Sequence, residues 1–234
     1  MILYVIDADS SVRCNLHGRL QASGVTVWPF ARAEDFLAQV ADLPAGPIMA
    51  DLPRASGPGP DLLEALASRA IRWPTIVMTA QTDIATVVAA MKHGAIEVLA
   101  KPLQAERLYA ALNLAFALLA SAARKTSRQQ AARLRLERLT TRERSVVSAL
   151  ITGKTNRVIA EELAISTRTV EGHRAGALRK FGVRSIAEMV YVAVDGGVDL
   201  RSGDGAALPR IIPFALPDGI GANLPAGRSS PVFG

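Results

Sequence analysis

The chain has 234 residues, half of them hydrophobic and 21% charged, which argues against a disordered or fibrous protein. The length allows two modest domains or one large one. No uninterrupted apolar run reaches the roughly 18 residues of a membrane span, the first residues lack the basic segment of a signal peptide, and Cys14 is the only cysteine. We therefore expect a cytoplasmic protein with no membrane partner, disulfide framework or multi-thiolate zinc site.

The net charge of +6 is distributed unevenly along the chain. Residues 1–120 carry a net charge of −2, residues 121–200 carry +7 and residues 201–234 carry +1. An excess of positive charge in the middle of the chain favours a polyanion partner such as nucleic acid, although a solvated helical surface has the same composition. Charge alone does not choose between these two interpretations.

Short apolar runs alternate with helical patterns through the first 120 residues. The runs show little polar alternation, which is typical of strands buried on both faces of a parallel sheet. Because crossovers between parallel strands are right-handed, the pattern predicts an α/β domain with a doubly wound five-stranded parallel sheet of order 2-1-3-4-5. The expected strands are 3–6, 25–28, 47–50, 75–78 and 97–100, and the expected helices are 11–22, 33–41, 61–69, 84–93 and 105–120.

Four polar side chains stand at the ends of the predicted strands. Asp7, Asp51, Thr79 and Lys101 follow the first, third, fourth and fifth strands. In a doubly wound sheet these ends meet on one rim, which is where such folds bind ligands. Carboxylates, a hydroxyl and an ammonium together are suited to Mg²⁺ and a phosphoryl group. One polar residue at a strand end would mean little, but four at matched ends predict a site.

The rest of the chain divides into three parts. Residues 121–137 are polar and basic, and are either a linker or a helical extension. Residues 138–197 predict a second, all-α domain of four helices, with capping boxes at Thr140–Glu143 and Ser185–Glu188 and glycine stops at Gly153 and Gly182. The tail over 198–234 is rich in Gly, Pro, Ser and Ala, so we expect it to be disordered and assign it no function.

Within the helical region, residues 156–181 predict a helix-turn-helix. A short helix is followed by a tight turn and a second helix, for which Ser166 is the expected N-cap. On that helix Val170, Ala177 and Phe181 recur at helical spacing and should face inward. The opposite face carries small and charged residues that would let it enter a DNA groove. An ordinary surface helix would show the same amphipathic pattern.

The first domain resembles the receiver domain of bacterial two-component response regulators. The resemblance rests on Val-Ile-Asp-Ala-Asp at 5–9, Asp51 with Gly59 eight residues on, Thr-Ala at 79–80 and Lys-Pro at 101–102. It implies that Asp51 accepts a phosphoryl group from a histidine kinase, that Thr79 binds its oxygens and that Lys101 pairs with its charge. It also implies a cis Lys101–Pro102 bond and Mg²⁺ as cofactor. The implied metal ligands are Asp7, Asp51 and Pro53.

Several positions depart from the receiver pattern. Ala8 stands where the family carries a second acidic metal ligand, which counts against Mg²⁺, and Asp9 should point to the opposite face of the strand. Arg54 and Ala55 replace a Met-Pro pair, and Val98 replaces the aromatic residue that turns together with the threonine. A receiver with these changes would be weakly phosphorylated or fixed in one state.

The second domain resembles the LuxR-type DNA-binding domain of the NarL/FixJ subfamily. The shared motifs are Leu-Thr-x-Arg-Glu at 139–143, Asn-Arg-x-Ile-Ala at 156–160 and Ser-x-Arg-Thr-Val-Glu-x-His-Arg at 166–174. The resemblance implies that residues 167–181 enter the major groove, with Glu171, Gly172 and Ala175 nearest the base edges. It also implies that phosphates are held by Lys154, Asn156, Arg157, Thr169, Arg174 and Lys180. The implied DNA-binding residues are Lys154, Asn156, Arg157, Ser166, Thr167, Arg168, Thr169, Glu171, Gly172, Arg174, Ala175 and Lys180.

We therefore expect a non-enzymatic transcriptional response regulator. Its expected partners are double-stranded DNA, a cognate sensor histidine kinase and a second copy of the chain, with RNA polymerase as a further candidate. Ala8 and Val98 favour an alternative in which the receiver is a phosphorylation-independent dimerisation or partner-binding module. Two weaker alternatives are an enzyme acting on a small phosphorylated substrate and a receiver that acts only through protein partners.

Overall fold

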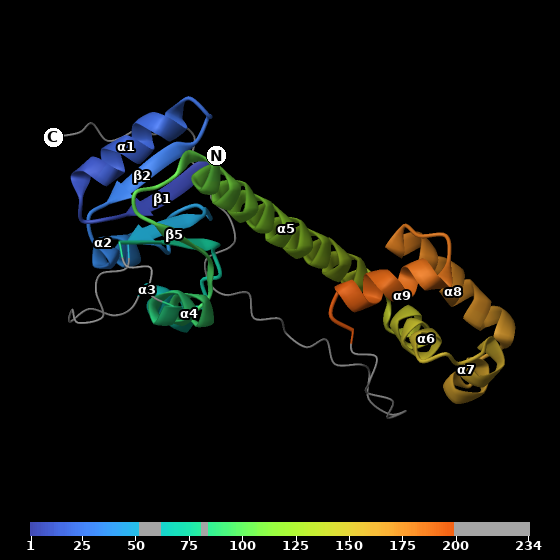
Figure 1. Ribbon diagram of the computed structural model, residues 1–234. Helices are drawn as coiled ribbons and strands as arrows, with labels where there is room; N and C mark the ends of the chain where they lie inside the picture. The colour runs from blue at the N-terminus through green and yellow to red at the C-terminus, as the bar shows by residue number, and fades with distance from the viewer. Residues whose placement is uncertain (52–61, 81–83, 199–234) are drawn as a thin grey trace. The chain divides into compact units, whose positions relative to one another are not determined.

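The computed structural model describes residues 1–51, 62–80 and 84–198 (Figure 1). Its contacts divide the chain into two compact units, the first ending at Ser121 and the second beginning at Ala122. Each unit is built around its own hydrophobic core. The predicted disordered tail lies, apart from Val198, outside the described residues.

The first unit contains a five-stranded parallel sheet in the order β2-β1-β3-β4-β5, which confirms the predicted fold. Pairing aligns the carboxyl ends of the central strands, because Ile6 lies opposite Ala50 and Asp51 lies opposite Met78. Polar residues at these ends are therefore brought to one rim. The strands are β1 (Ile2–Ile6), β2 (Thr26–Phe30), β3 (Ile48–Asp51), β4 (Thr75–Thr79) and β5 (Ala95–Ala100).

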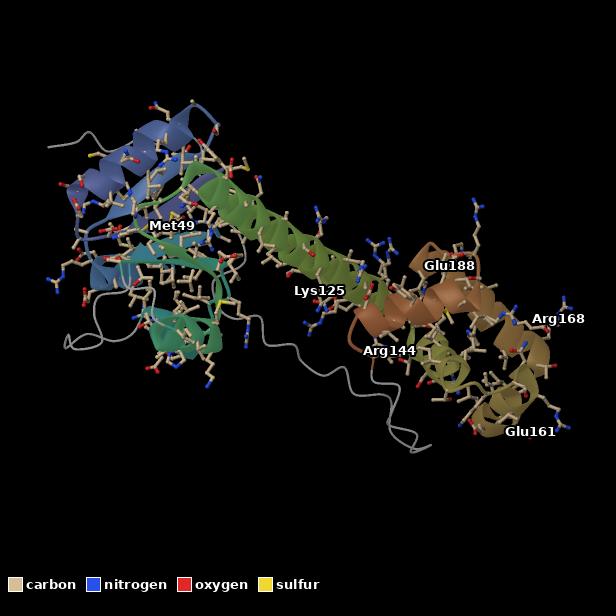
Figure 2. The ribbon with its side chains drawn as sticks, in the orientation of Figure 1. Met49, Lys125, Arg144, Glu161, Arg168 and Glu188 are labelled. Atoms are coloured by element: carbon tan, nitrogen blue, oxygen red, sulfur yellow. The ribbon has the colours of Figure 1, made fainter. Side chains whose placement is uncertain are left out.

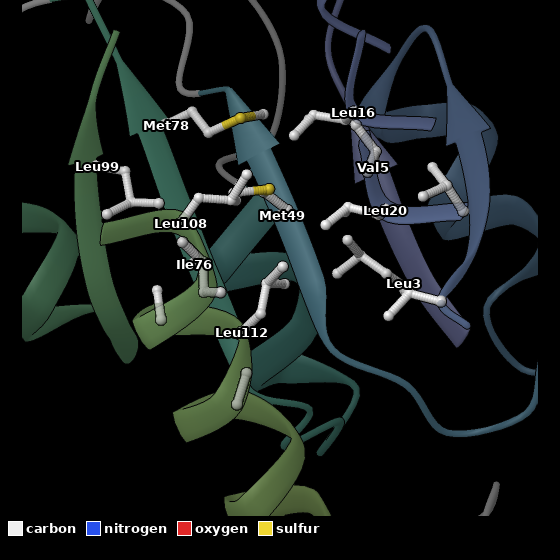
Figure 3. Close-up of a cluster of buried hydrophobic side chains, with 14 residues drawn as sticks. Leu3, Val5, Leu16, Leu20, Met49, Ile76, Met78, Leu99, Leu108 and Leu112 are labelled. Atoms are coloured by element: carbon white, nitrogen blue, oxygen red, sulfur yellow. The ribbon is translucent and has the colours of Figure 1, made fainter. Parts of the chain in front are cut away.

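Helices cover both faces of this sheet. Helix α1 (Ser10–Gln21) and the first part of α5 (Ala105–Glu137) enclose the largest core cluster with alternate residues of the strands (Figure 3). Helices α2 (Ala33–Gln39), α3 (Leu62–Ser68) and α4 (Ile84–Lys92) pack on the other face. Burying one large apolar side chain contributes about 1.5–3 kcal/mol, so these two layers hold the strand ends in place.

Helix α5 is longer than the predicted helix over 105–120. It continues through the basic stretch 121–137, so of the two alternatives left open by the sequence the structure shows the helical extension. The sequence explains this, because no Gly or Pro occurs between 105 and 137 and the stretch is rich in Ala, Leu, Arg and Gln. Near its end, Leu136 is part of the core of the second unit and Ala132 is buried.

The second unit contains the four predicted helices: α6 (Thr141–Ile151), α7 (Asn156–Leu163), α8 (Thr167–Phe181) and α9 (Ile186–Asp195). Thr140 and Glu143 form the predicted reciprocal capping box, and Ser166 caps α8 as expected. At α9 the box is incomplete, because Ser185 accepts from the Glu188 N–H while the Glu188 carboxylate bonds the N–H of Arg184 instead.

The core of the second unit is closed by side chains from all four helices. Val146, Ile159, Val170, Phe181 and Met189 are fully buried, which confirms the predicted inward face of α8. Within residues 1–51, 62–80 and 84–198, no helix is both long and apolar enough to span a bilayer.

Candidate functional site

Asp7, Asp51 and Lys101 meet at the carboxyl rim of the sheet, as predicted. Asp7 directly follows β1, Asp51 ends β3 and Lys101 directly follows β5. The ammonium of Lys101 lies 2.7 Å from Asp7 Oδ2 and 3.0 Å from Asp51 Oδ1, so it bridges the two carboxylates. Thr79 ends β4, is buried, and accepts a main-chain hydrogen bond from the N–H of Lys101. The Lys101–Pro102 bond is cis, as the resemblance implies.

The two carboxylates have different environments. The side chain of Asp7 is 1% exposed and that of Asp51 is 29% exposed, so Asp51 is the carboxylate that an incoming group can reach. Burial raises the pKa of Asp51, and the hydrogen bond from Lys101 offsets this only in part. Desolvation opposes the charge on Lys101, but hydrogen bonds to both carboxylates outweigh it and raise the pKa of the ammonium. The lysine is therefore a permanent cation at neutral pH.

Asp9 lies beyond the end of β1, so the strand alternation used for its prediction does not extend to it; it is the N-cap of α1, and its negative charge still acts on Lys101 and Asp51. The Asp9 carboxylate accepts the N–H of Ser11 at 2.8 Å and caps α1, while its own N–H donates to Asp7 Oδ1 at 2.9 Å. Arg13, which the sequence analysis missed, donates from its guanidinium to the backbone carbonyls of Asp7 and Ala8. Its position one turn into α1 was the only available signal.

Among the described residues, the side chains at this rim do not complete a divalent-cation site. Mg²⁺ needs oxygen ligands that can face the ion, whereas Lys101 Nζ occupies one oxygen of each carboxylate and the Asp9 N–H occupies the other oxygen of Asp7. Ala8 supplies no side-chain oxygen. In the part of the chain that the structure describes, no three His, Cys, Asp or Glu side chains are grouped to hold a metal. The predicted ligand Pro53 lies outside that part, as do Arg54, Ala55 and Gly59.

A second candidate site is formed by α7, the following turn and α8. Ala164 ends α7 in the left-handed conformation, with φ 53° and ψ 46°, which produces the sharp turn of a helix-turn-helix. Ser166 then caps α8, where the side chain of Arg168 extends outward from the first turn (Figure 2). Both the fold and the exposed face agree with the sequence prediction.

The predicted DNA-binding residues differ in exposure. Lys154, Asn156, Arg174 and Lys180 are half-buried. The remainder are exposed on α7, the turn and α8: Arg157, Ser166, Thr167, Arg168, Thr169, Glu171, Gly172 and Ala175.

Both lysines that the sequence predicts as phosphate contacts are engaged within the domain. Lys180 Nζ bonds Glu143 Oε2 at 2.6 Å, and Lys154 Nζ lies 2.6 and 2.8 Å from the two carboxylate oxygens of Glu162. The sequence analysis predicts that these lysines contact DNA phosphates, because the sequence alone does not show which acidic residues lie beside them in the folded domain. For Lys154, eight residues separate the pair, and for Lys180, 37.

Comparisons with known proteins identify the families of both domains. Residues 3–113 match the response regulator receiver domain family, and residues 137–193 match the luxR family of bacterial regulatory proteins. The fold and the two sites therefore define a response regulator, in which a receiver domain is joined to a LuxR-type DNA-binding domain. Receiver domains generally bind Mg²⁺ for phosphorylation.

Relatives that match over most of this chain show which group of response regulators it belongs to. The chain is 34% identical to the transcriptional regulatory protein FixJ of Bradyrhizobium diazoefficiens over 84% of this chain and 96% of FixJ, and 30% identical to TdiR of Thauera aromatica over 83% and 86%. The structure of the response regulator StyR matches with a TM-score of 0.71 at 33% identity, covering 82% of this chain and 98% of StyR. The chain belongs to the FixJ-like response regulators, which are phosphorylation-dependent, DNA-binding transcription regulators.

Proposed function

We propose that Asp51 is the phosphoacceptor of this regulator and that a cognate histidine kinase is the donor. The observation that carries this proposal is the contrast between the two carboxylates held by Lys101, because Asp7 is enclosed and Asp51 is open to a donor. An Asp51 oxygen attacks the phosphorus of a phosphohistidine, the P–N bond breaks, and the imidazole nitrogen keeps the bonding pair and takes up a proton. Thr79 and Lys101 then bind the oxygens of the new acyl phosphate.

Intact mass tests this assignment. Incubation of the full chain with acetyl phosphate is expected to add one phosphoryl mass, and Asp51→Asn is expected to add none because the amide is not a nucleophile. Asp42→Asn, which changes an acidic residue away from the strand ends, is the matched control and should be labelled like the wild type. Equal labelling of Asp51→Asn and wild type would contradict the proposal.

We further propose that α8 enters the major groove of duplex DNA, with Glu171, Gly172 and Ala175 nearest the base edges and Arg168 contacting the DNA beside them. Arg168 is exposed in the first turn of α8, and small residues on the same face allow a close approach. Arg168→Ala should weaken specific binding by about tenfold, since one base or phosphate contact contributes about 1–3 kcal/mol. Arg107→Ala, an equal charge change on the receiver unit, should leave the affinity unchanged. Equal affinity of all three proteins would contradict this role.

The functional form is proposed to be a homodimer that binds two half-sites. On α4, Ile84, Val88 and Met91 are exposed at helical spacing, and Leu114 and Leu118 are exposed on α5. On α9, Met189 is buried in the core, whereas Tyr191 and Val194 are exposed. Sedimentation of wild type against Val88→Glu tests the α4 contact, and a dimer unaffected by the charge would contradict it. RNA polymerase as a partner stays a prediction.

One observation favours the phosphorylation-independent alternative. Val98, in place of the aromatic switch residue, is buried in a cluster with Val77, Ala90 and Ala95, where it cannot make a large rotation between pocket and surface. The alternative predicts the same DNA affinity with and without a phosphoryl group on Asp51.

A further inference from the structure

At the carboxyl rim of the sheet, Lys101 meets two carboxylates. Its ammonium lies within 3.0 Å of both Asp7 and Asp51, so it stands between the two groups that the family pattern assigns to a divalent cation. A single protein cation already neutralises half of the negative charge of these carboxylates. The pocket therefore has an internal counter-charge before any ligand enters.

Three neighbouring features act against a divalent cation at the same place. Ala8 removes an oxygen ligand, and the carboxylate of Asp9 is committed to the N-terminus of α1. The guanidinium of Arg13 lies against the carbonyls of residues 7 and 8, which places a further positive charge beside the missing ligand. A dication would be attracted by the carboxylates of Asp7, Asp51 and Asp9, but it would also meet two cations already in place and a reduced ligand set.

We propose that Lys101 takes over the electrostatic role of Mg²⁺, so that this receiver is phosphorylated on Asp51 without a divalent cation; the inference rests on the proposed function of Asp51. With acetyl phosphate, an Asp51 oxygen forms a bond to phosphorus as the bond between phosphorus and the acetyl oxygen breaks. Acetate leaves with the bonding electrons, and an acyl phosphate remains on Asp51. Lys101, already hydrogen-bonded to the attacking carboxylate, stabilises the charge on the transferring oxygens.

Phosphorylation kinetics with and without metal test this inference. The full chain is incubated with acetyl phosphate in either Mg²⁺ or EDTA, and intact mass is followed over time. Labelling in EDTA is expected to stay within about twofold of labelling in Mg²⁺, because the essential charge is part of the protein. Labelling that needs Mg²⁺ would overturn the inference while leaving Asp51 as phosphoacceptor. No labelling in either buffer would overturn the proposed function together with it.

Lys101→Met gives the complementary test. Removing a preorganised donor costs about a hundredfold or more in rate, so labelling of this variant in EDTA should fall by at least that factor. A variant that keeps the wild-type rate in EDTA would overturn the inference. The far-ultraviolet circular dichroism of Lys101→Met is compared with that of wild type to establish that the variant folds. If it does not fold, the variants Ala8→Asp and Ala8→Asn test the inference instead.

Metal binding itself provides a readout that does not depend on phosphorylation. In calorimetric titrations with MgCl₂, wild type should show no saturable heat, whereas Ala8→Asp restores an acidic ligand and should bind Mg²⁺ at least about tenfold more tightly. Ala8→Asn is the matched control, since it has nearly the same shape without the charge. If wild type bound Mg²⁺ saturably and as tightly as Ala8→Asp does, the result would contradict the proposal that this pocket excludes Mg²⁺.

Discussion

Among single residues, Glu143 has the largest number of described polar contacts in the second unit. Its carboxylate accepts from the Thr140 N–H at 2.8 Å, the Thr140 hydroxyl at 3.0 Å and Lys180 Nζ at 2.6 Å. One side chain thus caps α6 and ties it to α8. The Leu-Thr-x-Arg-Glu motif predicted the cap, but the bond to Lys180 depends on a contact that only the folded chain reveals.

Glu143 should make the stability of the second unit depend on pH. Burial alone would raise the pKa of Glu143, but hydrogen bonds from Lys180 and Thr140 outweigh it and lower the pKa below its ordinary value of 4.5. The stabilisation is therefore complete above pH 4.5 and is lost as the pH falls through the lower pKa of the folded state. Hydrogen exchange of α8 amides should show this loss in wild type.

The control is Glu143→Gln, which keeps the shape of the side chain and removes its titration. This variant should open more easily at neutral pH, by about 2 kcal/mol, because the charged hydrogen bonds are weakened. Its α8 protection should vary less with pH below 4.5 than that of wild type. A pH profile identical to that of wild type would show that another group is responsible.

Ala164 is strained where α7 ends. Its φ of 53° is unfavourable for a residue with a Cβ and is natural for glycine. Ala164→Gly should raise the free energy of unfolding of the second unit by about 0.5–1 kcal/mol, since relief of strain exceeds the added chain entropy. Ala187→Gly, at an exposed position in the regular helix α9, should lower it by a similar amount. Destabilisation by both changes would contradict the assigned turn.

At the scale of elements, α8 contains two glycines with opposite surroundings. A Cβ on Gly172 would meet no atom within 4 Å, whereas a Cβ on Gly176 would lie 2.7 Å from Glu143 Oε1. Gly172→Ala should therefore stabilise the helix by about 1 kcal/mol. Gly176→Ala should destabilise it, because the carboxylate has to leave Thr140 or Lys180. Thermal unfolding of the pair measures the difference, and equal shifts would contradict this packing.

The sequence predicted most elements, because their patterns are local. The caps Thr140 and Ser166 follow from spacing that a short window contains. Strand order and the convergence of Asp7, Asp51 and Lys101 follow from the general rule that doubly wound sheets bring their strand ends to one rim. The bridging position of Lys101 and the contacts of Arg13 could not be predicted, since they depend on side-chain conformations.

The course of α5 could not be decided from the sequence either, because a basic linker and an exposed helix have the same composition. Contacts between distant residues settle it. Arg128 lies 2.8 Å from Asp195, and a Cβ on Gly196 would overlap Leu136 Cδ1, so the end of α5 packs closely against the end of α9.

At the scale of the whole molecule, the receiver unit and the DNA-binding unit each match a known domain family. Helix α5 begins in the first unit and ends in the second. A phosphoryl group on Asp51 can regulate DNA binding only if it favours one of two populated states of the protein. Such a coupling is a difference in binding free energy, typically about 1–3 kcal/mol.

The most direct measurement is therefore the affinity of the full chain for duplex DNA, at fixed salt, before and after phosphorylation by acetyl phosphate. We predict that phosphorylation tightens wild-type binding by about tenfold or more, and that Asp51→Asn binds equally in both conditions. Equal affinity of phosphorylated and unphosphorylated wild type would contradict the account and identify a regulator whose DNA binding does not depend on its receiver pocket.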